Sequence, residues 1–218
     1  MKIDEVRSIF QNMHPDYINL EKGVYCAEVS KTIFSCIEII PHRTYGVNMR
    51  VKIGLRNFPT VEKSFISHGK GLLKTPDSGN KIKSVTTDKS LQYLTYDIID
   101  NKEEWPEYIF YTKPGNHKFS DEKGNITKWF DFMTSLLSSV ITQCSTEKGI
   151  LEFLQEEKNG QKIRFGFWNY TSHPYVYYFL LKKLKHDDVA LKFLSELEEV
   201  QHLSQSDVEL LRNTEIPN

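Results

Sequence analysis

The chain has 218 residues, a formal net charge of −1 at pH 7, 26% charged residues and 39% hydrophobic residues. A chain of this length buries enough apolar surface to fold without metals or disulfides, and its composition excludes a fibrous or wholly disordered protein. The near-neutral charge argues against a dedicated nucleic-acid binder, which usually has a marked basic excess. No run approaches the roughly 18 apolar residues of a membrane span, and the first residues include acids where a signal peptide would be apolar. We therefore expect a cytoplasmic protein with no membrane association.

The chain contains three cysteines, Cys26, Cys36 and Cys144, without metal-ligand spacing. An odd number of cysteines without a secretory signal is typical of reduced thiols. A turn centred on Lys31 would place Cys26 opposite Cys36 on a neighbouring strand. A disulfide is conceivable there, but the expected compartment favours two small buried thiols.

The first predicted element is a short helix that ends before Pro15, because apolar residues recur at helical spacing: Ile3, Val6, Phe10 and Met13. Short apolar runs separated by turn residues then predict three antiparallel strands, over residues 24–29, 32–40 and 45–57.

The strongest pattern in the chain is an alternation of apolar and polar residues, in which every odd position from Tyr45 to Leu55 is apolar. A period of two is typical of a strand with one face in a core and the other in water. Arg50 and Lys52 make the outer face mildly basic, and we expect them to be exposed or paired with acids such as Glu38. The front half is therefore predicted to be an antiparallel sheet.

Periodicity fades from residue 58 to about residue 90, where glycine, proline and lysine are frequent. This composition predicts a long basic loop, and we expect Lys63 to Lys83 to be the least ordered internal stretch. The segment from His68 to Gly71 could cradle a phosphate, but no strong helix follows it, so an exposed loop is the preferred interpretation. Whether the loop binds an anion is left open. Two further strands are predicted, over residues 91–99 and 107–112.

After residue 120 the apolar period changes from two to 3.6 residues, which predicts helices. We expect a long helix from Ile126 to Cys144, a short helix near residues 150–160, a late strand over residues 162–170, and helices over residues 174–185 and 187–203. Ser206 and Glu209 form a potential capping box for a last helix. The predicted fold is one α+β domain over residues 1–218, β-rich to residue 120 and helix-rich afterwards. It has an N-terminal helix, a mostly antiparallel sheet of about five or six strands, and C-terminal helices on one face.

One candidate active site follows from the order of Asp77, Asp100 and Lys102, an order used by a large class of metal-dependent nucleases. Two carboxylates can hold magnesium against a scissile phosphate while a lysine steadies the attacking water. However, Asp77 lies among turn residues, and similar acid and lysine spacing recurs at residues 121–123. Solvated turns are therefore the preferred interpretation, and a metal-dependent enzyme acting on nucleic acid or a phosphate-containing substrate is the alternative. No nucleotide, histidine-based or cysteine-based metal motif is present, so no cofactor and no metal site are predicted.

The segment from Phe165 to Phe179 contains eight aromatic residues. One strand and one helix face cannot turn all of these rings inward. We therefore expect that at least two of four rings lie on a surface that a partner covers: Trp168, Tyr170, Tyr177 and Tyr178. The alternative is that the C-terminal helices cover these rings within the monomer. The favoured function is a cytoplasmic, non-catalytic protein-binding or regulatory protein that uses the aromatic segment and a sheet edge.

Overall fold

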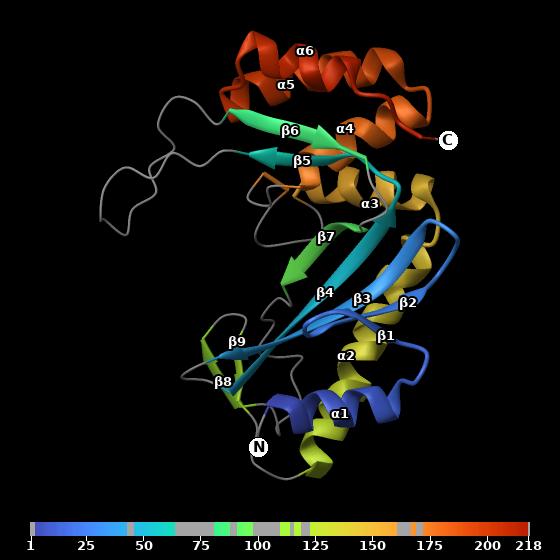
Figure 1. Ribbon diagram of the computed structural model, residues 1–218, viewed down its shortest axis with the longest axis vertical. Helices are drawn as coiled ribbons and strands as arrows, with labels where there is room; N and C mark the ends of the chain where they lie inside the picture. Colours follow the sequence, from blue (N-terminus) through green and yellow to red (C-terminus); the bar gives the residue numbers. More distant parts are fainter. Residues whose placement is uncertain are drawn as a thin grey trace, which may run out of the picture.

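The computed structural model describes residues 3–42, 46–63, 81–87, 91–97, 110–113, 116–118, 123–160, 167–168 and 172–217. The fold is α+β, as predicted, with a helix before the sheet and five helices after it in these residues (Figure 1). The helices are α1 (Ile3–Met13), α2 (Lys123–Gln143), α3 (Glu147–Lys158), α4 (His173–Lys183), α5 (Asp187–Gln201) and α6 (Gln205–Asn213). The strands are β1 (Ile18–Glu21), β2 (Val24–Glu28), β3 (Ile33–His42), β4 (Gly46–Arg56), β5 (Thr60–Lys63), β6 (Ile82–Thr86), β7 (Leu91–Asp97), β8 (Phe110–Lys113) and β9 (Asn116–Lys118).

Seven of these strands form one antiparallel sheet in the order β1-β2-β3-β4-β9-β8, and β7 also pairs with β4. The remaining two strands, β5 and β6, pair with each other in a small second sheet beside the C-terminal helices (Figure 1). Among the described strands, β1 pairs with β2 alone and ends the larger sheet on that side.

The alternation predicted for β4 is confirmed where its side chains are described. Val51, Ile53 and Leu55 are buried, and Arg50 and Lys52 lie on the opposite face. Their cationic groups approach Oε2 of Glu38 at 3.9 Å and 2.9 Å, which is the predicted cross-strand pairing. The side chains of Val47 and Met49 lie outside the described residues.

The main core lies between the sheet and the helices, and one cluster of buried apolar residues extends from α1 to α6. Helix α2 passes behind β2, β3 and β4 (Figure 1). Its Phe130 ring packs against Phe10 of α1, with ring centroids 5.1 Å apart. Within the described part of the chain, no helix combines the length and apolar character that crossing a membrane requires.

Five local predictions differ from the structure or lie outside it. Strands β1 and β9 were not expected, and β5 and β6 pair within the segment predicted to be a loop. The capping box of α6 is formed by Ser204 and Asp207, not by Ser206 and Glu209. The strand predicted over residues 162–170 and most of the stretch from Lys63 to Lys83 lie outside the described residues.

The prediction of reduced thiols at Cys26 and Cys36 is wrong, because the structure joins them in a disulfide. The two residues face each other in the register of β2 and β3, as expected, so their sulfur atoms meet. Cys144 is buried and takes no part in this disulfide.

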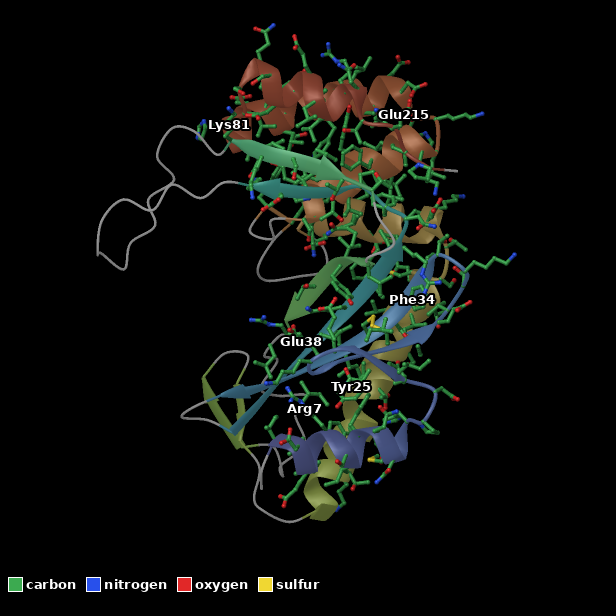
Figure 2. The ribbon with its side chains drawn as sticks, viewed as in Figure 1. Arg7, Tyr25, Phe34, Glu38, Lys81 and Glu215 are labelled. Carbon is green, nitrogen blue, oxygen red and sulfur yellow. A yellow bond between two sulfur atoms is a disulfide. The ribbon has the colours of Figure 1, made fainter. Side chains whose placement is uncertain are left out.

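The outer face of the sheet is also less solvated than its sequence suggests. Four buried residues form a small apolar cluster there around the disulfide: Val24, Cys26, Phe34 and Cys36. Figure 2 shows the disulfide beside Phe34. Strand β2 is therefore buried on both faces near its start, where Val24, Tyr25 and Cys26 are all buried in succession.

Candidate functional site

The three residues of the predicted active site, Asp77, Asp100 and Lys102, lie outside the described residues, and so does Tyr170. Of the four rings among which at least two were expected at a partner surface, Tyr177 and Tyr178 are buried instead, at 4% and 1% exposed. Trp168 is partly buried and stacks on Phe193 with ring centroids 5.7 Å apart.

An aromatic cluster explains the burial of Tyr177. Tyr177 meets Phe193 edge-on at 4.8 Å, and Phe167 meets both of these rings. The Tyr177 hydroxyl donates to Oε1 of Gln155 on α3, and burial raises the pKa of Tyr177 above its usual range. Helices α3 and α5 therefore cover Tyr177 within the monomer, as the alternative interpretation expected for this ring.

Among the strand side chains of the larger sheet whose burial is described, those of β1 are the most exposed. All four of its residues are exposed, and the side chains of Ile18 and Leu20 are 64% and 48% exposed. By register Ile18 pairs with Cys26 and lies on the face of the disulfide, whereas Asn19 pairs with Tyr25 and lies on the face of α1. A bulge between Asn19 and Glu21 interrupts the pairing.

The turn from β1 to β2 fits closely around Arg7 of α1. Gly23 adopts a φ of +85°, and a Cβ at this position would lie 2.5 Å from Nη2 of Arg7 and 2.7 Å from the carbonyl oxygen of Ile39. The same Nη2 donates to that carbonyl at 3.1 Å. Glycine is therefore required both by the backbone conformation and by the passage of the arginine side chain.

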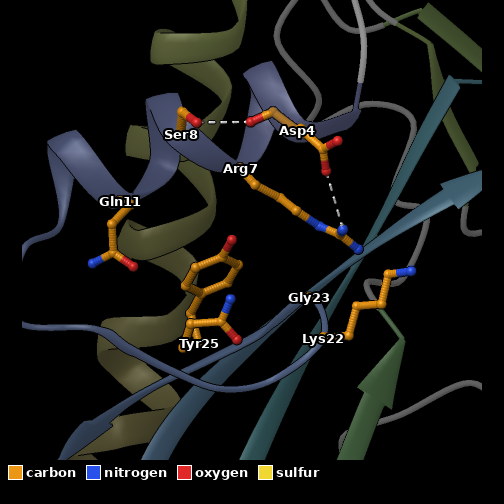
Figure 3. Close-up of a pocket in the computed structure, with 8 residues that line it drawn as sticks. Asp4, Arg7, Ser8, Gln11, Lys22, Gly23 and Tyr25 are labelled. Atoms are coloured by element: carbon orange, nitrogen blue, oxygen red, sulfur yellow. Dashed lines mark hydrogen bonds and ion pairs between the residues drawn. The ribbon is translucent and has the colours of Figure 1, made fainter.

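A polar pocket of about 470 Å³ lies between α1 and this turn (Figure 3). Figure 3 shows the side chains of Arg7, Gln11 and Tyr25 reaching into the space between the helix and the hairpin. Burial raises the pKa of the Tyr25 hydroxyl, against the opposing effect of the Arg7 cation. The pocket is lined by Asp4, Arg7, Ser8, Gln11, Asn19, Lys22, Gly23 and Tyr25.

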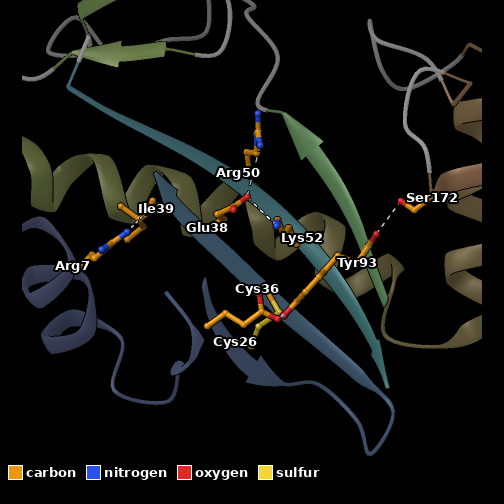
Figure 4. A network of polar contacts seen from close by, with 10 residues as sticks. Arg7, Cys26, Cys36, Glu38, Ile39, Arg50, Lys52, Tyr93 and Ser172 are labelled. Atoms are coloured by element: carbon orange, nitrogen blue, oxygen red, sulfur yellow. Dashed lines mark hydrogen bonds and ion pairs between the residues drawn. A yellow bond between two sulfur atoms is a disulfide. The ribbon is translucent and has the colours of Figure 1, made fainter. Parts of the chain in front are cut away.

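A polar network crosses the outer face of the sheet next to the disulfide (Figure 4). The Lys52 ammonium, paired with Glu38, lies 4.9 Å from the centroid of the Tyr93 ring. The Tyr93 hydroxyl approaches Oε1 of Glu21 on β1 at 3.5 Å. Burial raises the pKa of Tyr93 to about 12, and the Glu21 carboxylate adds to this shift. This network links β1 to the centre of the sheet.

A second polar cluster joins β5 to the C-terminal helices. The Lys63 ammonium donates to Oε1 of Gln201 at 2.6 Å and lies 4.8 Å from the centroid of the Tyr175 ring. Burial lowers the pKa of Lys63 to about 8, although the Asp207 carboxylate opposes the shift. Asp207 also accepts from the backbone N–H of Ile82 at 3.0 Å, which ties β6 to α6.

A buried ion-pair geometry connects α3 to the start of α4. Nδ1 of His173 lies 2.9 Å from both carboxylate oxygens of Glu157, and neither side chain is exposed. The pair fixes the position at which α4 begins. Among the side chains that the structure describes, no group of three or more His, Cys, Asp or Glu residues is arranged to hold a metal ion.

Comparison with known proteins gives no family for this chain. No protein-family model matches it, and neither a curated protein nor a solved structure matches it significantly. The interpretation of the site therefore rests on the geometry of the chain itself.

The pocket and the exposed strand beside it were missed by sequence reasoning. The signal available was weak: Ile18 and Leu20 alternate with polar residues, and Lys22-Gly23 is a suitable turn before β2. Those features could have predicted the hairpin. They could not have placed Arg7, which comes from a helix that precedes it.

Proposed function

We propose that the protein is a non-catalytic protein-binding protein that recognises its partner through β1. The observation that carries the proposal is that this terminal strand is wholly exposed and carries two exposed apolar side chains, Ile18 and Leu20. An open strand edge presents N–H and C=O groups with which an extended segment of another protein can pair. Apolar side chains beside that edge add contact area.

The strand at the other side of β4 is less suited to such pairing. In β7 the carbonyl oxygen of Tyr93 already accepts from Oγ of Ser172 at 3.0 Å and from Nε2 of Gln92 at 3.2 Å. The side chains of Gln92 and Leu94 are buried. These contacts favour β1 over β7 as the binding edge.

Affinity capture from the native cell with the full chain, followed by mass spectrometry, tests the proposal. The double variant Ile18→Lys with Leu20→Lys places two charges on the edge and is expected to abolish partner recovery while the protein stays folded, because both side chains are exposed. The matched control is Val189→Lys with Leu191→Lys, which alters two similarly exposed apolar residues on α5. Recovery that survives in the β1 variant and is lost in the α5 variant would place the interface on α5 instead.

Two further expectations stay predictions. The metal-dependent enzyme has no support from a described residue, since Asp77, Asp100 and Lys102 lie outside the described ranges. The cytoplasmic location is opposed by the Cys26–Cys36 disulfide, because disulfides persist in oxidising compartments and are rare in the cytosol. Thiol labelling of the protein in its native cell tests the location through the redox state of Cys26 and Cys36. Reduced cysteines would indicate the cytosol, and a disulfide would indicate an oxidising compartment.

A further inference from the structure

A strand added to β1 would continue the alternation of the sheet. Its residue beside Asn19 would face the polar pocket, whereas its neighbours along the chain would face the side of Ile18 and the disulfide. Directly opposed side chains on neighbouring strands have Cβ atoms about 5 Å apart. The pocket is thus the place into which a bound strand would direct one of its side chains.

The charged groups that line the pocket favour an anion. Arg7 and Lys22 are opposed only by Asp4 among the lining residues, and the Asp4 side chain is 88% exposed. Nη1 of Arg7 lies 3.6 Å from Oδ1 of Asp4, a distance at which water competes strongly with the ion pair. The excess is therefore one positive charge within a concave site.

Hydrogen-bond donors are also in excess in this pocket. Nη2 of Arg7 is used by the Ile39 carbonyl, but its buried Nε has no hydrogen-bond partner among the described residues. The ammonium of Lys22 and the amide of Asn19 stand at the exposed rim. A carboxylate offers up to four acceptor sites for these donors, and its negative charge would balance the excess positive charge of the pocket.

We infer that the pocket is a carboxylate subsite, and that the partner segment which pairs with β1 carries an aspartate or glutamate at the position beside Asn19. This inference rests on the proposed function, because it names the chemistry of the partner at the same edge. The occupant is an extended acidic segment of a protein with apolar residues before and after the acid, which contact Ile18 and Leu20.

An NMR titration tests the inference with the full chain labelled with nitrogen-15. The probes are two short blocked peptides of alternating threonine and valine that differ only by a central glutamate or glutamine. The glutamate peptide is expected to shift the backbone amides of Asn19, Leu20 and Lys22 and to bind about two- to fivefold more tightly, as a partly exposed ion pair would provide. The preference is expected to fall in Lys22→Gln, because one of the two cations of the pocket is lost while Arg7 remains. It should persist in Lys31→Gln, which removes an exposed charge from the β2–β3 turn.

The outcomes separate the inference from the function on which it rests. Equal binding of both peptides at β1, or a glutamate preference that Lys22→Gln leaves unchanged, overturns the carboxylate subsite while edge pairing stands. The absence of shifts at β1 with either peptide also overturns the subsite. Partner capture by the Ile18 and Leu20 variant then decides the protein-binding function separately.

Discussion

Helix α4 and strand β1 differ sharply in how far their residues are buried. Nine consecutive residues of α4, from His173 to Leu181, are buried, whereas all four residues of β1 are exposed. Helix α4 lies against α3 and α5 and also meets the β5–β6 region through contacts of Tyr175 and Phe179. Strand β1 has one neighbouring strand in the part of the chain that the structure describes. The exposure of these two elements therefore follows from where each lies in the fold. It does not follow from the number of aromatic residues that each contains.

The sharpest test of this comparison is the removal of one ring from α4. Tyr177→Ala is expected to cost about 3–5 kcal/mol of unfolding free energy, because a large side chain is lost from a packed aromatic cluster. Ile18→Ala, the control in β1, should change stability by about 0.5 kcal/mol or less. Urea denaturation followed by circular dichroism measures both. If Tyr177→Ala lowered the free energy of unfolding as little as Ile18→Ala does, the Tyr177 ring would lie at the surface. The aromatic interface predicted from the sequence would then be supported again.

The second-largest effect on stability is expected from the Cys26–Cys36 disulfide, which joins β3 to β2, the strand that pairs with β1. The bonded cysteines are 10 positions apart, and closing such a loop stabilises a protein by about 2.5 kcal/mol through the entropy of the unfolded chain. The oxidised protein is therefore expected to unfold at higher urea concentration than the protein in excess dithiol reductant. The Cys26→Ala, Cys36→Ala variant should not respond to the reductant, although it keeps Cys144. Three free thiols counted in the untreated native protein would mean that the expected reduced state was correct.

A smaller effect is expected at the turn that separates β1 from β2. Gly23→Ala places a Cβ in a left-handed conformation, which costs about 1–2 kcal/mol, and also against Arg7 and Ile39. Gly160→Ala is a matched control, because Gly160 also has a positive φ but its Cβ would meet no atom of the described residues within 4 Å. Gly23→Ala should therefore lose more stability than Gly160→Ala in the same thermal unfolding assay. Equal losses would show that Arg7 yields without cost and that the close fit of the turn is unimportant.

The sequence predicted the elements whose patterns are local and long. The alternation of β4 predicted its buried face and the pairing of Arg50 and Lys52 with Glu38, and helical spacing predicted α1 and α2. Strands β5 and β6 have no such pattern. Strand β6 is instead stabilised by a residue distant in sequence, because the backbone N–H of Ile82 donates a hydrogen bond to Asp207 of α6. A period of 3.6 predicts a helix with one buried face, so it could not reveal that α4 is enclosed on all sides. The pocket could not be predicted because Arg7 and Gly23 meet only after α1 docks on the sheet.

The last prediction tests the polar cluster that encloses α4 from the side of β5. Folding lowers the pKa of Lys63 from its ordinary value of 10.5 to about 8, so the unfolded chain binds more protons than the native protein between these two values. Stability is therefore expected to rise with pH across this window. Lys63→Met should reduce that rise, because methionine keeps the length of the stem without the charge. Part of the rise remains in this variant, because burial also lowers the pKa of Lys182. Lys83→Met is the control, since Lys83 lies on the paired strand with its side chain mostly exposed beside Glu62.

Tyr175 opposes this rise in stability at the upper end of the pH window, because burial raises its pKa and the unfolded phenol ionises first. Urea denaturation of the native chain and both variants at a series of pH values is thus most informative from about pH 8 to 9.5. A slope in that range that is identical in the native chain and Lys63→Met would mean that Lys63 is solvated, and that β5 does not close over α4 as tightly as the contacts with Gln201 and Tyr175 indicate.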